Sequence, residues 1–124
     1  MTPDEMKART KQFSLRVIKL VRALEQSVVG SVIGKQVLRS GTSVGSNYRA
    51  VCRARSDREF LAKMSIVIEE ADETGYWLEL IIEDGMMPKK QVLPLLTECE
   101  EIVAMMVASR KTAQQTTENR KHQS

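Results

Sequence analysis

Apolar residues recur every three or four positions through the first quarter of the chain, the spacing of one face of an α-helix. The residues of this stripe are Met6, Phe13, Val17, Leu20 and Leu24. Thr2 and Glu5 form a capping-box pattern, and Pro3 occupies the first helical position, where proline is well tolerated. The pattern predicts a helix from Thr2 to about Gln26.

Two glycines and two serines interrupt the pattern between Ser27 and Gly34, so we predict the first turn there and expect its valines and isoleucine still to pack. A second helix follows, roughly over Ser31–Ala54. One of its faces carries Val37, Gly41, Val44, Tyr48 and Val51. Because glycine in a helix costs about 1 kcal/mol relative to alanine, Gly41 and Gly45 predict that another helix approaches closely.

A third helix is predicted from Asp57 to about Asp84, since Ser56 and Glu59 repeat the capping-box spacing and Gly85 follows the last apolar residue. Its apolar residues form two adjacent stripes and a third line. They are Phe60, Met64, Val67, Ala71, Leu78 and Ile81, then Leu61, Ile68 and Ile82, then Ile66, Trp77 and Leu80. This surface is wider than one neighbouring helix requires, which indicates burial on two sides and hence an oligomer.

A fourth helix is predicted to begin at Pro88, with Pro94 either kinking its first two turns or moving its start to about Leu93. Its apolar residues are Leu95, Leu96, Cys99, Ile102, Val103, Met106 and Val107. After Ala113 the chain has nothing to bury, so we expect one domain over residues 1–115 and a flexible tail over 116–124. Four helices joined by short turns predict an all-α, antiparallel up-down-up-down four-helix bundle.

The composition agrees with a helical protein, because aromatic residues are few and β-branched residues form no alternating runs. No apolar run approaches the roughly 18 residues of a membrane span, and the chain start lacks the form of a signal peptide. We therefore expect a cytoplasmic protein with no membrane partner. Cys52 and Cys99 are interpreted as reduced packing residues, with a disulfide as the alternative.

The residue types that catalysis or metal binding would need are missing from suitable positions. His122, the one histidine, lies in the predicted tail, which removes histidine-dependent triads. Cysteine, histidine and carboxylate residues do not occur at metal-ligand spacing, and Gly30–Gln36 departs from a phosphate loop in both spacing and its last residue. We expect no enzyme activity, no metal, no cofactor and no small-molecule substrate.

Charge is segregated along the chain. Residues 35–63 carry seven basic and two acidic groups, whereas residues 64–101 carry two basic and ten acidic groups. Arginines and lysines follow one side of the second helix and its corner, and such a stripe can track phosphates. Without aromatic residues for base stacking, binding would be electrostatic and tolerant of sequence. The alternative is that these cations pair with the acidic run over residues 69–73. The side chains that line up on one side of the third helix could likewise meet basic groups of the second helix or of a neighbouring subunit; they are Asp72, Tyr76, Glu79 and Glu83.

Four segments resemble a known family. They are Gln36–Ser56, which reads QVLRSGTSVGSNYRAVCRARS, then Glu59-Phe60, Glu69–Leu80 and Ala108–Thr112. The chain is similar here to the bacterial four-helix bundle proteins also called 23S rRNA intervening sequence proteins. The resemblance implies a ring-like homopentamer without enzymatic activity, whose genes often lie inside large ribosomal RNA genes. Similar proteins serving diversity-generating retroelements bind a reverse transcriptase and nucleic acid. Gly75 departs from the family pattern and is expected to loosen local packing.

Two functional hypotheses follow. In the first, an oligomeric bundle binds RNA or a ribonucleoprotein through Lys35, Arg39, Arg49, Arg53, Arg55 and Arg58. In the second, the bundle is a protein-interaction scaffold that binds no nucleic acid, and its arginines are structural. The subunit interface that we expect consists of Tyr48, Asp72, Glu73, Tyr76, Trp77 and Leu80.

Overall fold

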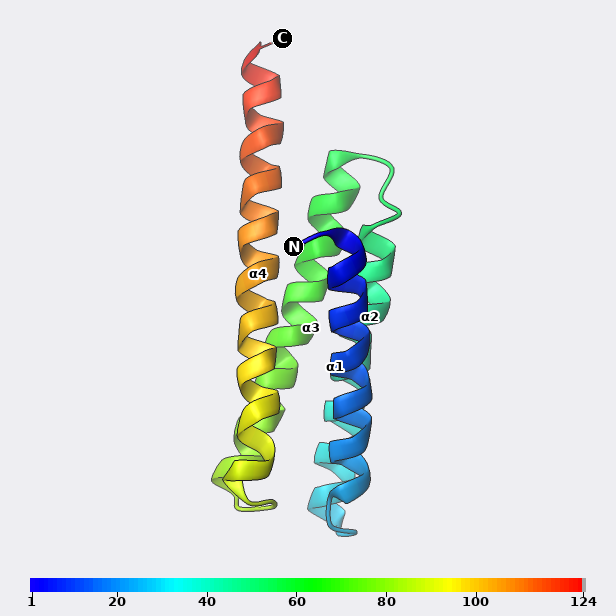
Figure 1. The fold of residues 1–124 in the computed structure, drawn as a ribbon, viewed down its shortest axis with the longest axis vertical. Coiled ribbons are helices and arrows are strands. Elements are labelled where there is room, and N and C mark those ends of the chain that lie inside the picture. Colours follow the sequence, from blue (N-terminus) through cyan, green and yellow to red (C-terminus); the bar gives the residue numbers. More distant parts are fainter. Residues whose placement is uncertain (124) are drawn as a thin grey trace.

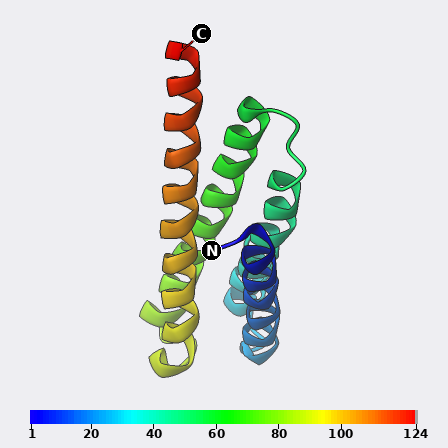
Figure 2. The same cartoon turned by 45° about the horizontal axis from the view of Figure 1, so that its top comes forward.

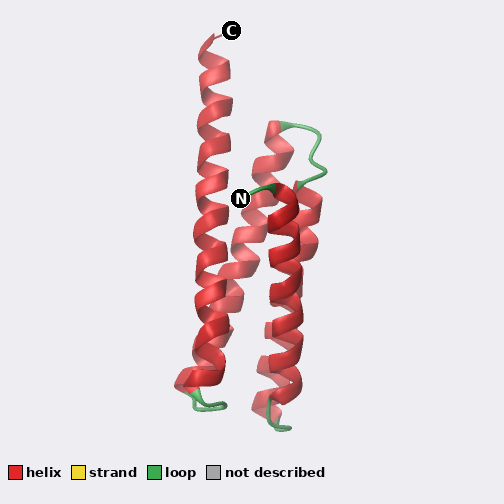
Figure 3. Ribbon diagram, viewed as in Figure 1, coloured by secondary structure: helices red, strands yellow, loops and turns green. Residues whose placement is uncertain are grey.

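The computed structural model describes residues 1–123 as four helices joined by short loops (Figures 1 and 3). The helices are α1 (Pro3–Ala23), α2 (Val28–Val51), α3 (Asp57–Glu83) and α4 (Lys89–Gln123). Successive helices pack antiparallel, and the residues described contain no strand, so the predicted all-α antiparallel bundle is confirmed. Ser124, the last residue of the predicted tail, lies outside the described residues.

Hydroxyl caps begin three of the helices. The Thr2 hydroxyl accepts a hydrogen bond from the Glu5 amide and the Ser56 hydroxyl accepts one from the Glu59 amide, each at 3.1 Å, so both predicted caps are confirmed. The Ser27 hydroxyl accepts a third hydrogen bond from the Gly30 amide at 2.9 Å. These bonds satisfy amides that the first turn of a helix leaves without partners.

The predicted position of the first turn, Ser27 to Gly34, is wrong, because Ser27 already caps the start of α2. The helix α1 ends at Ala23, and residues 28–34 already belong to α2. The glycines there serve close packing, because a Cβ atom on Gly30 would lie 2.3 Å from the Glu25 carbonyl oxygen. The expected packing is also wrong for the three valines of this segment, which are exposed.

The predicted close approach at the second helix is confirmed, and its partner is α1. A Cβ atom on Gly41 would lie 2.8 Å from both γ-carbons of Val17, and one on Gly45 would lie 3.3 Å from the Thr10 carbonyl oxygen. Contacts of this kind have no room for a side chain. Glycine therefore sets the spacing between α1 and α2.

The helices follow one another around the bundle, so α2 packs on α1 and α3, and α3 packs on α4 (Figures 1 and 2). The seam between α1 and α4 is the thinnest of the four. Polar groups inside are paired: the Thr74 and Ser40 hydroxyls lie 2.9 Å apart, and the Cys99 thiol donates to the Ala71 carbonyl at 3.0 Å. Cys99 is thus a reduced packing residue as predicted, whereas Cys52 is also free but exposed, so its predicted packing role is wrong.

The helix α4 is longer than predicted. It begins at Lys89, one residue after Pro88, and Pro94 lies inside it, which rules out a start at Leu93. It also continues through Gln123 instead of ending near Ala113, since its last turns are rich in good helix formers and carry basic residues at the C-terminal end. The side chains of these turns are mostly exposed, in line with the expectation that they have little to bury.

Candidate nucleic-acid interface

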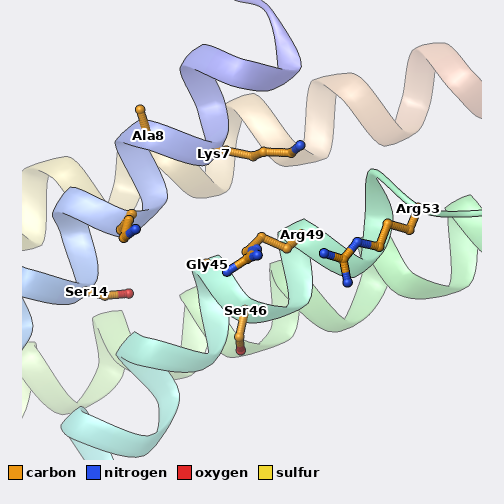
Figure 4. A pocket seen from close by; sticks show the side chains of 8 residues that line it. Lys7, Ala8, Ser14, Gly45, Ser46, Arg49 and Arg53 are labelled. Carbon is orange, nitrogen blue, oxygen red and sulfur yellow. The ribbon is translucent and has the colours of Figure 1, made fainter.

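A groove of about 440 Å³ lies between the N-terminal half of α1 and the C-terminal half of α2 (Figure 4). Four cations line it, Lys7 and Lys11 from α1 and Arg49 and Arg53 from α2. Each pair is spaced i, i+4, so its two side chains leave the same face of their helix. Gly45, which allows the two helices to meet closely, lines the groove as well.

The cations of this groove lack strong acidic partners. Within the described chain, no carboxylate lies within 4 Å of Lys11, Arg49 or Arg53. Lys7 has one distant partner, an exposed Asp4 carboxylate at 3.9 Å. The groove therefore presents positive charge to solvent with its hydrogen-bond donors available.

A second hollow, of about 630 Å³, continues the groove over α2 toward α3. It shares Arg49 and Arg53 with the groove and adds Arg55 and Lys63. Glu59 interrupts the positive charge: its carboxylate lies 3.0 Å from the Lys63 ammonium, and that hydrogen bond holds the pKa of Glu59 below its usual value. The surface formed by both hollows is here called the basic track. Its residues are Lys7, Lys11, Arg49, Arg53, Arg55 and Lys63.

The stripe of arginines and lysines predicted on the second helix, now α2, divides into two parts. Arg39 contacts two carboxylates of α3, Glu70 at 3.2 Å and Glu73, and also the side chain of Gln36. For Arg39 the alternative reading, pairing with the acidic run, is therefore the one that the geometry fits. Lys35 and Arg58 are also among the residues predicted to bind nucleic acid. Both are exposed, and they belong neither to the track nor to the contacts of Arg39.

Other arginines are held by neighbouring helices. Arg9 of α1 reaches α4, where its guanidinium lies 2.6 Å from a Glu98 oxygen and 3.3 Å from a Glu101 oxygen. The hydrogen bond with Arg9 holds the pKa of Glu98 below its usual value. Arg110 donates to the Leu61 carbonyl and, at 2.7 Å, to the Ser65 hydroxyl. These contacts link helices and leave fewer donors for a ligand.

Sequence reasoning did not identify Lys7, Lys11 or Lys63 as part of the basic surface. The signal for the two lysines of α1 was present in the i, i+4 spacing and in the glycines of α2. Placing them beside Arg49 and Arg53 required the register between α1 and α2, which the contact of Gly41 with Val17 fixes. Periodicity within one helix does not reveal that register.

Most of the expected interface residues lie on α3, at the seams with α2 and α4. Trp77 is half-buried and donates to Glu73 at 3.0 Å, and Tyr76 is 53% exposed with its ring edge-on to Trp77. Tyr48 is 8% exposed and packs in the core of this same chain, which leaves little of it for another subunit. Leu80 is half-buried and Asp72 is exposed.

An acidic groove of about 310 Å³ runs between α3 and α4, across the bundle from the seam of α1 and α2. Asp72, Glu79 and Glu100 give it negative charge, and the exposed Tyr76 adds an aromatic ring. Gly75 also lines it, and a Cβ atom there would lie 3.7 Å from the Cys99 sulfur. The lack of a side chain at Gly75 thus leaves space in this groove.

Neither a membrane span nor a metal-binding group is found in the part of the chain that the structure describes. None of its helices is both long and apolar enough to cross a bilayer. No group of three or more histidine, cysteine or acidic residues within it could hold a metal ion.

Comparison with known proteins identifies a family and similar solved structures. A family model described as 23S rRNA-intervening sequence protein matches residues 5–108. A crystal structure from Bacteroides thetaiotaomicron, described as a protein with unknown function from the S23 ribosomal protein family, is 33% identical with a TM-score of 0.82. The alignment covers 90% of this chain and 99% of that one. No curated protein matches the chain.

Proposed function

Since this chain belongs to the 23S rRNA-intervening sequence protein family, we propose that it is a non-catalytic bundle that binds RNA, alone or within a ribonucleoprotein, through its basic track. The observation that carries the proposal is the contrast in pairing. Among the described residues, Arg49 and Arg53 have no acidic partner within 4 Å, whereas Arg9 and Arg39 each have two. Arg9 and Arg39 are thus tied to carboxylates, whereas Arg49 and Arg53 at the centre of the track remain available to phosphates.

Binding through the track is electrostatic. Each phosphate that a track cation neutralises releases a counterion, so the affinity falls steeply as salt rises. The two hollows lie along the cations of α1, α2 and α3, which fits a sugar-phosphate chain crossing the bundle. Few base-specific contacts are expected along this path, and the bound sequences should therefore be diverse.

Filter binding with variants of matched charge tests the proposal. Arg49→Glu with Arg53→Glu should weaken RNA binding at about 50 mM salt at least a hundredfold, since two phosphate contacts become repulsions. The control is Lys89→Glu with Lys90→Glu, which changes net charge equally at exposed positions in the first turn of α4. Its affinity should stay within about threefold of wild type. Absence of RNA binding by the wild type, or equal losses in both variants, overturns the proposal.

A second candidate function, a scaffold built from several copies, is favoured by the acidic groove between α3 and α4. That groove offers negative charge and an exposed aromatic ring on the side of the bundle away from the basic groove. Opposite charges on opposite faces suit head-to-tail association, and closure of such contacts gives a ring. The family resemblance supports a ring of five copies. Along α3, Ile66 is exposed and Leu61 half-buried, so apolar surface remains for a neighbour.

Light scattering tests whether copies of the chain assemble through the acidic groove. The wild type should have a mass several times 14.0 kDa, and Asp72→Lys with Glu79→Lys should lower that mass if the acidic groove joins copies. A wild-type mass of 14.0 kDa contradicts assembly. A variant that remains assembled contradicts the groove as the contact but leaves the RNA proposal standing.

A further inference from the structure

A cleft of about 610 Å³ opens at the end of the bundle, between the last part of α4 and the corner that joins α2 to α3. Figure 1 shows α4 running past this corner. Apolar side chains of Tyr48, Val51, Phe60 and Ala113 line the cleft. Burial raises the pKa of Tyr48 to about 12, so its hydroxyl is uncharged near neutral pH. The apolar part of the cleft therefore carries no charge.

One wall of the cleft lies beyond the family match. The match to the family model ends at residue 108, whereas Ala113, Thr116, Thr117 and Arg120 all line the cleft. The continuation of α4 through Gln123 brings these residues opposite the corner. The cleft is therefore formed in part by a segment outside the matched residues.

The chemistry of the cleft combines an aromatic ring with cations at its edge. Phe60 is half-buried and offers a ring on which a flat base can stack. Arg55 and Arg120 supply positive charge, and the Asp57 carboxylate, which also lines the cleft, offsets part of it. One N–H group of Arg120 contacts Asp57 at 2.9 Å, and a guanidinium has four more donors. The hydroxyls of Thr116 and Thr117 already donate to α4 carbonyls but can still accept.

The cleft is continuous with the basic track. Arg55 lines both the cleft and the hollow that extends the track toward α3. A strand whose phosphates follow Arg49 and Arg53 therefore reaches the mouth of the cleft at Arg55. A duplex holds its bases in the stack, so an unpaired nucleotide is the form that could enter.

We propose that this end cleft binds one unpaired nucleobase of the RNA on the basic track, stacked on Phe60 with its phosphate between Arg55 and Arg120. This inference rests on the proposed function and adds to it a preference for single-stranded RNA. The track provides affinity that depends on charge, and the cleft provides affinity that depends on the presence of a base. The two contributions can therefore be measured separately.

Binding of two single strands with equal charge tests the inference. Wild-type protein should bind a twelve-residue oligouridine about tenfold more tightly than an abasic strand of the same length. Phe60→Leu, which keeps an apolar side chain, should reduce that ratio to about threefold or less. The salt slope should not change, since no phosphate contact is lost. The control Leu15→Ala, at an exposed position of α1, should keep the wild-type ratio.

The outcomes distinguish the inference from the proposed function. If both strands bind equally to the wild type, or if Phe60→Leu keeps the wild-type ratio, the cleft does not hold a base. The track is then still supported if Arg49→Glu with Arg53→Glu abolishes binding of both strands. If the wild type binds neither strand at about 50 mM salt, the proposed function and the inference both fail.

Alkylation of the native thiols gives a second readout. Cys52 is exposed and lines the cleft, whereas Cys99 is buried and its pKa is raised to about 12 by that burial. Iodoacetamide should therefore react at Cys52 first. Saturating oligouridine should slow this reaction at least fivefold, and the saturating abasic strand should leave its rate nearly unchanged. Equal protection by both strands would place the backbone, not a base, over Cys52.

Discussion

The middle and the end of α2 carry arginines in opposite situations. In the middle of the helix, Arg39 faces α3 and contacts Glu70 and Glu73. Near its end, Arg49 and Arg53 face a groove whose other cations are Lys7 and Lys11 of α1. The sequence alone shows these three arginines on one side of one helix.

The difference comes from the helix across each seam. The side chains of α3 that reach Arg39 are acidic, so charge is neutralised within the chain. The charged side chains of α1 that line the groove are both basic, so positive charge accumulates. The function of a charged stripe therefore depends on the helix that it faces. Like charges gathered in one groove repel and destabilise the fold, and a bound polyanion would offset that repulsion.

Giving Arg49 and Arg53 the kind of neighbours that Arg39 has should produce the largest effect. Lys7→Glu with Lys11→Glu places carboxylates opposite the two arginines. RNA affinity in filter binding should fall about a hundredfold at low salt, because two cations are lost and the other two become paired. Thermal stability should stay the same or rise slightly, since repulsion is relieved.

The matched control is again Lys89→Glu with Lys90→Glu, which lowers the net charge equally without entering the groove. Equal RNA affinity for the Lys7, Lys11 variant and the wild type would show that the groove is not where RNA binds.

Widening the seam between α1 and α2 should give the next largest effect. Gly41→Val forces a side chain against Val17, whose γ-carbons already lie 2.8 Å from the position of a Cβ atom. Overpacking of this kind lowers the free energy of unfolding by about 1–3 kcal/mol. Urea denaturation followed by circular dichroism measures it.

Gly75→Ala is the control for this substitution, because its Cβ atom would meet its nearest neighbour at 3.7 Å, an ordinary contact. An alanine in a helix interior is also favoured over glycine. If both variants lose the same stability, close packing at Gly41 is not what holds α1 on α2.

Removing a paired arginine and an unpaired one should separate structural from functional cations. Arg9→Gln should lower the free energy of unfolding by about 1–2 kcal/mol, because Glu98, whose side chain is 17% exposed, loses its charged partner. Arg49→Gln should change it by less than about 0.5 kcal/mol. Salt slopes of RNA binding should show the reverse order. Equal stabilities of the two variants would contradict the distinction.

The smallest expected effect is the change in the free energy of unfolding at low pH that comes from the contact between Arg9 and Glu98. The hydrogen bond with Arg9 lowers the pKa of Glu98 in the folded chain, so the contact stabilises the fold above the unfolded value of about 4.3. That stabilisation is lost as the pH falls from there through the lower, folded pKa. Wild type should therefore lose more stability than Glu98→Gln in this window, measured by denaturation at each pH. Parallel curves for the two proteins would contradict it.

The fold could be predicted well from local signals. Thr2 and Ser56 marked helix starts because a capping hydroxyl acts within three residues, and the apolar stripes marked the buried faces. Ser27 was missed, although it caps in the same way, because nearby glycines also suit a turn. The end of α4 was missed because a helix can continue on propensity without burying a face.

The candidate site could be predicted only in part. Arg49 and Arg53 stood out as clustered charge, but Arg39 looked the same to sequence reasoning. What separates them is the register of α1 and α3 against α2, which arises from contacts between residues far apart in the chain, such as Gly41 with Val17. Exposure of Cys52 likewise depends on the corner after α2, where the helix ends at Val51.

The contact between α1 and α4 is the smallest between neighbouring helices, so the bundle should open most easily along this edge, with α2 and α3 remaining packed together. Arg9 of α1 holds the edge closed through its ion pairs with Glu98 and Glu101 of α4. Transient separation of α1 from α4 would admit water to the core but leave α1 packed on α2, so the basic groove would stay intact. Local opening of the bundle should therefore not disturb its charged surface.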